Sequence, residues 1–502
     1  MSITKRIVSV VLCVCMVIST LLFGKTPEAE EIPQIIVGDS VVVWYADESM
    51  TDYISAMAVA FHEKYDIRVI PQLQSGLEYV ESIYDASVTD EMTTPDVFIV
   101  SNEALEKAYL TGLADIISDP DNVVNTQHFP QAAINAVTYD DKLVGYPYYF
   151  ETSVLLYNRS YIYEMAKNQL LAETTDEAAV NGGEVVLSDD ASESSTEEAA
   201  TKEEVSEEAI EERINELVPN TFEELLAFAN EYDAPAAVEG VFKWDVSDIF
   251  YNYFFAGNYM NVGGPCSDTP EEVDIYNLDV IRAMQIYQSL NQFFSFEAND
   301  MKYASVIQEF MEGKMVYTTA TSDIIRTLDA AKEEGTFTFD YGLVEIPDLN
   351  EELQTRNLSV TNTVVVNGFS NRKEDANKFA SYLTSEEASS LYEKTGKIPA
   401  LTQDACKDDK TAVFYREYED SVPAPKMMVT SNLWVQLEVT FAEVWNGAPV
   451  SRSLQSLSEL IMSQVSGSEY EVEFIEEPKE EEETVEYLDE EAEREAAMQD
   501  AD

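Results

Sequence analysis

The sequence predicts an α/β protein built as two lobes, and three observations lead to this prediction. Strand-like apolar runs alternate with helix-like runs from residue 35 onward, which is typical of parallel βαβ units. The chain of 502 residues suits two lobes of roughly 150 to 200 residues each. Near the middle, Tyr139–Ile162 carries two apolar strands on either side of a proline and an aromatic cluster. Such a stretch is typical of a solvent-exposed hairpin or of a crossing between two lobes.

The N-terminus has the features of a segment for export. A short basic region precedes an apolar run, Ile7–Phe23, which is somewhat short for a membrane span and suits the core of a secretory signal. Leu12 precedes Cys13 and Val14 precedes Cys15, so a lipobox is not found. We therefore expect residues 1–25 to be a signal peptide or an N-terminal anchor. The protein is then extracellular, at the cell surface or membrane-anchored.

Charge and cysteine content exclude several classes of protein. The formal net charge is −66, and a face able to bind nucleic acid needs clustered Lys and Arg, so we expect no nucleic-acid partner. After the signal region only Cys266 and Cys406 remain, too few for a disulfide framework, and whether they pair stays open. His62 and His128 form no ligand-spaced cluster with them, so we expect neither a metal nor a cofactor.

The first third of the chain reads as alternating strands and helices. Strands are predicted at Ile35–Tyr45, Arg68–Leu73 and Pro95–Val100, and helices from Met50 to Tyr65, over Tyr79–Ala86 and up to Tyr109. Ligands of open α/β sheets bind outside the carboxyl ends of the strands. This rule places five residues at one edge of the sheet: Trp44, Tyr45, Ser101, Asn102 and Glu103.

The middle stretch supplies the strongest single candidate for a binding residue. We predict a strand over Lys142–Tyr146 that ends at Pro147, because proline has no amide hydrogen to donate to a sheet. Three aromatic residues and Glu151 follow, and a second buried strand is predicted over Val154–Tyr157. A carboxylate among aromatic side chains needs a hydroxyl or a cation as its partner.

Two acidic segments differ from the rest of the chain. Residues 173–212 are rich in Glu, Ala, Ser and Thr and lack aromatic residues, so we expect a disordered insertion with helical tendency near its end. Order resumes where Thr221 and Glu224 have the spacing of a capping box. From residue 469 to 502 the chain is mostly acidic, and we expect a disordered tail.

The remaining elements follow in order. Phe242–Gly264 is dense in aromatic residues and contains Trp244 and Asp245. The rest are predicted as a helix (Asp279–Phe294), a helix end, glycine turn and strand (Phe310–Thr321), two strands (Phe339–Glu345 and Thr361–Val366), two helices (Asn371–Leu383 and Ser385–Lys394), and final helices with Trp434 and Trp445.

Four pieces of the sequence, in this order, resemble the extracellular solute-binding proteins of ABC importers, family 1, and most closely its maltose-binding-protein-like sugar binders. They are PDVFIV followed by SNEALEKAYLTGLADI, DKLVGYPYYFETSVLLYNRSYI, EFMEGKMVYTTATSDI, and VTNTVVVNGFSNRKEDANKFASYLTSEEASSLYEKTGKIPA. The resemblance implies a periplasmic-binding-protein-like fold of type II, with crossover strands between the lobes and a ligand cleft. It also implies that Glu103 and Glu151 accept hydrogen bonds from sugar hydroxyls and that Trp434 is a stacking platform.

The resemblance also divides the chain into segments. We expect lobe one over residues 35–147, lobe two over 148–360 around the acidic insertion, a return to lobe one over 361–399, and C-terminal helices of lobe two over 400–468. The expected partners are a carbohydrate, with an oligosaccharide favoured, and the transmembrane permease subunits of an ABC transporter. The protein itself is expected to be a monomer.

Carbohydrate binding requires aromatic faces together with carboxylates and amides that converge in a concave site. The residues that the sequence offers for this task are Trp44, Tyr45, Asn102, Glu103, Tyr148, Glu151, Trp244, Asp245 and Trp434. No nucleophile elbow, phosphate loop, dinucleotide motif or zinc spacing is present, so we expect no enzyme, although Glu103 and Glu151 could form a glycosidase pair. Two alternatives stay open: a cationic solute such as a polyamine, and an anchored sensor or scaffold without transport.

Overall fold

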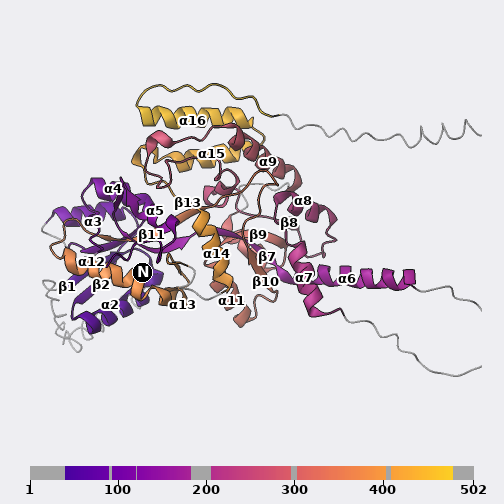
Figure 1. Ribbon diagram of the computed structural model, residues 1–502, viewed down its shortest axis with the longest axis horizontal. Coiled ribbons are helices and arrows are strands. Elements are labelled where there is room, and N and C mark those ends of the chain that lie inside the picture. Colours follow the sequence, from indigo (N-terminus) through magenta and orange to yellow (C-terminus); the bar gives the residue numbers. More distant parts are fainter. Residues whose placement is uncertain are drawn as a thin grey trace, which may run out of the picture.

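The computed structural model describes residues 40–89, 93–119, 121–181, 205–294, 302–402 and 409–478. These residues form two main sheets that lie side by side (Figure 1). The first has the strand order β12-β6-β11-β3-β1-β2, with β13 paired to β11, and the second has the order β10-β7-β9-β8. We call each sheet with its covering helices lobe one and lobe two.

Lobe one combines parallel and antiparallel strands. Its strands are β1 (Ser40–Tyr45), β2 (Arg68–Leu73), β3 (Val97–Ser101), β6 (Tyr146–Glu151), β11 (Leu358–Val366), β12 (Ile398–Pro399) and β13 (Val422–Pro423). Its helices are α2 (Thr51–Tyr65), α3 (Tyr79–Val88), α4 (Leu105–Leu110), α5 (Gln131–Val137), α12 (Lys373–Ser381) and α13 (Leu391–Thr395). Strand β1 is parallel to β2 and β3, whereas β11 is antiparallel to β3 and β6. The predicted strand Arg68–Leu73 has the predicted bounds.

Both faces of the first sheet are covered, which explains why every residue of β1 is buried. Successive side chains of a strand point to opposite faces. Val41, Val43 and Tyr45 therefore belong to the core under α2 and α12, whereas Val42 and Trp44 pack on the other side with α3 and α4. Figure 1 shows α2 and α3 on opposite sides of this sheet.

Lobe two is built on a smaller sheet with more helices. Its strands are β7 (Ser153–Asn158), β8 (Gly240–Phe242), β9 (Met315–Thr321) and β10 (Tyr341–Val344). Its helices are α6 (Arg159–Asn181), α7 (Glu207–Leu217), α8 (Phe222–Glu231), α9 (Leu278–Phe294), α10 (Tyr303–Met311), α11 (Ile324–Glu334), α15 (Leu433–Trp445) and α16 (Val450–Ser466). Half of the predicted capping box is present, because Thr221 Oγ1 accepts from the amide of Glu224 at 3.1 Å, whereas Glu224 Oε2 accepts from the amide of Asn220 instead of that of Thr221.

The crossing between the lobes lies at Thr152, and this corrects two expectations. The predicted strand Lys142–Tyr146 is not one strand: β5 (Lys142–Leu143) pairs with β4 (Thr138–Tyr139), and β6 begins only at Tyr146. Strand β6 passes through Pro147 and runs to Glu151, so the expected lobe boundary after Pro147 falls inside a strand of lobe one. Proline is tolerated there because the pairing of β6 with β11 shifts at the adjacent position, between Asn362 and Thr363. Strand β7 then begins at Ser153 in the other sheet.

Polar side chains connect the crossing at Thr152 to Asn357, the residue just before β11, where the chain returns to lobe one. Asn357 Oδ1 accepts from Ser153 Oγ at 3.0 Å, and its Nδ2 donates to the carbonyl of Ser153 at 2.9 Å. The carboxylate of Glu417 accepts from Asn357 Nδ2 and from the amide of Ile346. Burial raises the pKa of Glu417 to about 8, although these two donors act in the opposite direction. We call Thr152, Ser153, Asn357 and Glu417 the joint.

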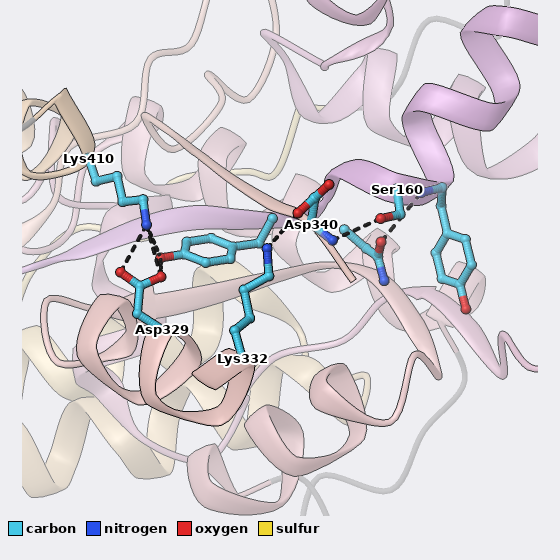
Figure 2. Close-up of polar contacts among 8 residues, drawn as sticks. Ser160, Asp329, Lys332, Asp340 and Lys410 are labelled. Carbon is cyan, nitrogen blue, oxygen red and sulfur yellow. Dashed lines mark hydrogen bonds and ion pairs between the residues drawn. The ribbon is translucent and has the colours of Figure 1, made fainter. Parts of the chain in front are cut away.

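Helix α14 (Asp409–Asp420) makes contacts with both lobes. Towards lobe one, the ring of Tyr418 stacks on Phe150 with centroids 3.8 Å apart. Towards lobe two, Lys410 Nζ lies 2.9 Å from each carboxylate oxygen of Asp329 on α11, as Figure 2 shows. The expected assignment of residues 400–468 to lobe two alone is therefore too simple, because α14 connects the lobes.

Helix α7 confirms the expected helical tendency near the end of the insertion, whereas the ordered first residues of the insertion and of the tail are contrary to expectation. The first and last residues of the insertion lie in α6 and α7, while residues 182–204 lie outside the described residues. The start of the tail packs along α16, where Ser451 Oγ donates to the carbonyl of Ile475 and Gln455 Nε2 donates to that of Val472. The N-terminal 39 residues, Cys406 and residues 479–502 also lie outside the described residues. Across the part of the chain that is described, no helix is long and apolar enough to cross a membrane.

Candidate functional site

Two hollows meet between the lobes and share Glu151 and Val360. The hollow on the lobe-one side has a volume of about 490 Å³ and the one on the lobe-two side about 380 Å³. Because two residues line both, the hollows form one continuous cleft across the crossing at Thr152. We call the two parts the lobe-one half and the lobe-two half of the cleft.

The lobe-one half is lined by strand ends and the loops that follow them. Strands β1 and β3 run in parallel and both finish here, so their carboxyl ends supply Tyr45 and Ser101. Antiparallel β11 and β6 bring the paired residues Asn362 and Tyr149 to the same place. The alternation of side chains along β6 then puts Glu151 on the same face as Tyr149.

Lys397 lines the lobe-two half of the cleft, where two carboxylates and a ring of lobe one hold its ammonium group. Its Nζ lies 3.1 Å from Glu151 Oε1 and 3.5 Å from Asp47 Oδ2, and 5.4 Å from the ring centroid of Tyr149. Burial acts to lower the pKa of Lys397, but Glu151 and Asp47 outweigh it and leave the pKa raised. The ammonium therefore stays charged. We call Asp47, Tyr149 and Glu151 the lysine cage.

The lobe-two half has an aromatic wall. Tyr251 and Tyr303 stack with centroids 4.7 Å apart and an angle of 11° between their planes, and Phe250 lies beside them. The hydroxyl of Tyr303 lies 3.0 Å from Thr321 Oγ1 at the end of β9 and 3.5 Å from Asp323 Oδ1. These bonds fix the wall, which offers flat apolar faces beside carboxylate oxygens.

A match to a family model decides what kind of protein this is. The model described as a bacterial extracellular solute-binding protein matches residues 56–412, which is more than half of the chain. The chain belongs to this family. The cleft between its lobes is therefore the candidate solute site.

Relatives and solved structures agree with this assignment. The chain is 21% identical to a galactooligosaccharide-binding protein of Bacillus subtilis (strain 168) over 85% of this chain and 90% of the relative. It is 20% identical to a maltodextrin-binding protein of the same strain, over 82% of this chain and 86% of the relative.

Among solved structures, a solute-binding protein of Staphylococcus aureus in complex with maltose matches with a TM-score of 0.65 at 17% identity, over 85% of this chain and 98% of that one. A maltose-binding periplasmic protein of Listeria monocytogenes matches with a TM-score of 0.63 at 18% identity, over 86% of this chain and 100% of that one. These likenesses confirm the predicted two-lobe fold.

Four of the nine residues predicted for the site of this solute-binding protein lie in the cleft or close to it. Tyr45 and Glu151 line it. Glu103 and Trp434 meet beside it, where the Trp434 indole donates to the Glu103 carboxylate and Ser101 Oγ donates to Glu103 Oε2 at 3.2 Å. The Glu103 side chain is exposed to solvent, yet desolvation by the surrounding protein raises its pKa, against the effect of the two donors.

The other three aromatic candidates lie in the hydrophobic cores rather than in the cleft. Trp44 is 3% exposed and Trp244 is fully buried, and neither lines a hollow. Each indole N–H has an internal acceptor at 2.9 Å, Gln72 Oε1 for Trp44 and Asn252 Oδ1 for Trp244. Tyr148 is buried because alternation along β6 turns it away from Tyr149, into the core under α2. We therefore remove these three from the candidate site.

The two remaining polar candidates form hydrogen bonds with backbone groups. Asn102 is fully buried, donates to the carbonyl of Ala424 at 2.7 Å and accepts from the amide of Thr361 at 2.9 Å. Asp245 is also buried and accepts from the amide of Tyr303 at 2.9 Å, at the start of α10. They position the chain behind the cleft and do not face a solute.

Six residues that make up much of the cleft were not predicted from the sequence. They are Asp47, Tyr149, Phe250, Tyr251, Tyr303 and Lys397. Counting alternate residues back from Glu151 would have selected Tyr149 instead of Tyr148. Lys397 follows Gly396 in the quoted GKIPA segment, but nothing local shows that this loop returns to β6.

The chemistry available in this cleft is binding. Its lining offers tyrosine rings, hydroxyls and carboxylates, which together can hold a polar solute with apolar faces. Within the described ranges, no group of three or more His, Cys, Asp or Glu side chains is arranged to hold a metal ion.

Proposed function

We propose that this protein captures a carbohydrate, with an oligosaccharide favoured, and delivers it to the membrane permease of an ABC transporter. The observation that carries the proposal is the pairing of a carboxylate, Glu151, with an aromatic wall across a single cleft. A sugar ring has apolar C–H faces that pack on aromatic rings and hydroxyls that donate to carboxylates. The relatives named above, which bind galactooligosaccharide and maltodextrin, support this class of ligand.

Delivery would depend on closure of the lobes around the solute. A ligand that contacts Glu151 on one side and Phe250 or Tyr251 on the other interacts better with a closed arrangement than with an open one. Such differential contact is what shifts a conformational equilibrium. The joint at Thr152 is where we propose that the rotation occurs.

A cationic solute such as a polyamine is the second candidate. Four of the residues that line the cleft are acidic, namely Asp47, Glu151, Asp248 and Asp323, against one lysine, Lys397. The net charge of −66 would add to the attraction of any cation.

Thermal unfolding of the purified protein against neutral oligosaccharides, monosaccharides and polyamines tests both candidates. A ligand at 100 times its Kd stabilises the folded state by roughly 2.7 kcal/mol, which is visible as a rise in Tm. A rise with a neutral oligosaccharide supports the carbohydrate proposal. A rise with polyamines alone supports the second candidate, and no rise across the panel argues against both.

A further inference from the structure

The lysine cage has the composition of a site for an ammonium group. Carboxylates at 3.1 and 3.5 Å neutralise the Lys397 charge, and the Tyr149 ring lies within the distance at which a ring face attracts a cation. Tyr149 is 4% exposed, so this ring is largely desolvated. A primary amine of a solute would seek the same three groups. In this protein they already hold the chain's own ammonium.

The backbone on both sides of Lys397 is fixed, so this occupant is held in place. Gly396 has φ +77°, a left-handed conformation that ends α13 and suits glycine. The amide of Lys397 donates to Thr395 Oγ1 at 3.1 Å, and the next residue, Ile398, pairs with Phe150 in the sheet. The side chain therefore starts from a defined point beside Glu151.

The cage is equally well defined. Asp47 Oδ1 accepts from the amide and the hydroxyl of Ser49 at 2.9 and 2.6 Å, which leaves Oδ2 directed to Lys397. Glu151 is the last residue of β6 and is paired with Val360 of β11. The Asp47 carboxylate therefore has partners other than Lys397, and the sheet holds the backbone of Glu151, so the framework of the cage would persist without the lysine.

The other two acids of the cleft are already engaged differently. Asp248 Oδ1 accepts from the amide of Phe250 at 2.9 Å, and Asp323 Oδ1 accepts from Thr321 Oγ1 and lies near the Tyr303 hydroxyl. Among the described residues that line the cleft, Lys397 is the one cation, and it lies where two carboxylates converge.

We propose that Lys397 is a built-in occupant of an ammonium subsite and that it excludes cationic solutes from the cleft, which leaves the cleft selective for neutral ones. Tethering favours the internal amine, because a side chain attached beside its partners competes at a high effective concentration. This inference rests on the proposed function and deepens it, since it decides between the two solute classes that the acidic lining alone leaves open.

The test removes the occupant and asks whether a free amine replaces it. Putrescine is titrated calorimetrically into the parent protein, Lys397→Ala and Lys410→Ala. Lys410 is the matched control, because its Nζ also contacts a carboxylate, Asp329, and lies 4.8 Å from a tyrosine ring centroid, that of Tyr341, but outside the cleft (Figure 2). We expect Lys397→Ala to bind putrescine at least tenfold more tightly than the parent, and Lys410→Ala to match the parent.

A double variant, Lys397→Ala with Asp47→Asn, is expected to lose the gain, because one wall of the cage has lost its charge. Circular dichroism melting shows that each variant is folded. The proposal is overturned if folded Lys397→Ala gains no affinity, if Lys410→Ala gains as much, or if the parent already binds putrescine as tightly as Lys397→Ala. Failure of the proposed carbohydrate function has a different signature, namely that no neutral sugar binds the parent, whatever putrescine does.

Discussion

The two halves of the cleft hold their polar groups by different means. In the lobe-one half, strand ends present Tyr45, Tyr149 and Glu151, and the ammonium of Lys397, which lines the other half, neutralises the Glu151 carboxylate. In the lobe-two half, the wall consists of a short 3₁₀ segment, Ile249–Tyr251, and the first residue of α10, joined by ring stacking. One half is therefore fixed by the sheet and by charge, and the other by aromatic packing.

Because of this difference, substitutions in the two halves should affect solute affinity and protein stability differently. A strand end keeps its geometry when a side chain is changed, because the backbone pairing remains. A wall of stacked rings has no such support, so the residues that we propose bind the solute also hold the local structure together. Substitutions in the lobe-two half should affect both properties, whereas those in the lobe-one half should affect mainly binding.

The largest effect is expected for Tyr251→Ala. Tyr251 is 9% exposed and stacks on Tyr303, so its loss leaves a cavity and an unsupported partner. Removing a large buried aromatic side chain lowers the free energy of unfolding by about 3 to 5 kcal/mol. Chemical denaturation measures this loss, and we expect solute affinity to fall at least tenfold in the same variant. Tyr251→Phe keeps the ring and serves as the control; if it is as unstable as Tyr251→Ala, stacking is not what holds the wall.

A smaller and more selective effect is expected for Glu151→Gln. Hydrogen bonds to charged groups contribute about 1.5 to 3 kcal/mol, so the affinity for a neutral sugar should fall by roughly 10- to 100-fold. The amide keeps the shape of the side chain at the end of β6, so the melting temperature should change little. Calorimetric titration together with thermal melting checks both parts. Equal losses of stability in Glu151→Gln and Tyr251→Ala would remove the distinction between the two halves.

The joint between the halves should respond to pH. Glu417 has a pKa of about 8 in the folded protein, whereas an unfolded glutamate has a pKa near 4.3. Between these values the folded state binds the additional proton, so stability from this group is present below about pH 4 and is lost as pH rises towards 8. A rise of one pH unit in this window lowers the free energy of unfolding by about 1.4 kcal/mol, which corresponds to roughly 2 °C in Tm.

The matched variant for this effect is Glu417→Gln, which cannot titrate. Its melting temperature should fall less steeply between pH 5 and 8 than that of the parent. Parallel pH profiles for the two proteins would show that the slope arises from other groups.

Much of the fold could be predicted from the sequence, because it depends on local patterns. Strands β2 and β9 were predicted as short apolar runs bounded by helices or a glycine turn, and the periodic spacing of apolar residues predicted α2 and α9. The strand end predicted at Pro147 was wrong, because the effect of this proline on β6 depends on a shift in a partner strand more than 200 residues away. The ordered start of the acidic tail was missed for a similar reason, because its acceptors are carbonyls that meet Ser451 and Gln455 of α16.

The candidate site was predictable only where one strand end determined it. The rule that ligands bind beyond carboxyl ends selected Tyr45, and the aromatic cluster selected Glu151. The same rule selected Trp44, because a strand buried on both faces gives no sign of which side faces the cleft. Lys397 and the Tyr251–Tyr303 pair could not be predicted from the sequence, because each depends on contacts between segments that are distant in the sequence.

The crossing at Thr152 is a single residue between two paired strands. One extended residue spans only about 3.5 Å, so this connection has almost no slack. In the proposed mechanism, a solute bound at Glu151 lies close to the aromatic wall and reaches it through a small rotation of the lobes. Its second encounter is then intramolecular, with an effective concentration that for short linkers is on the order of millimolar. Two weak half-sites can in this way act as one strong site, and a longer connection would weaken capture without changing any group that touches the solute.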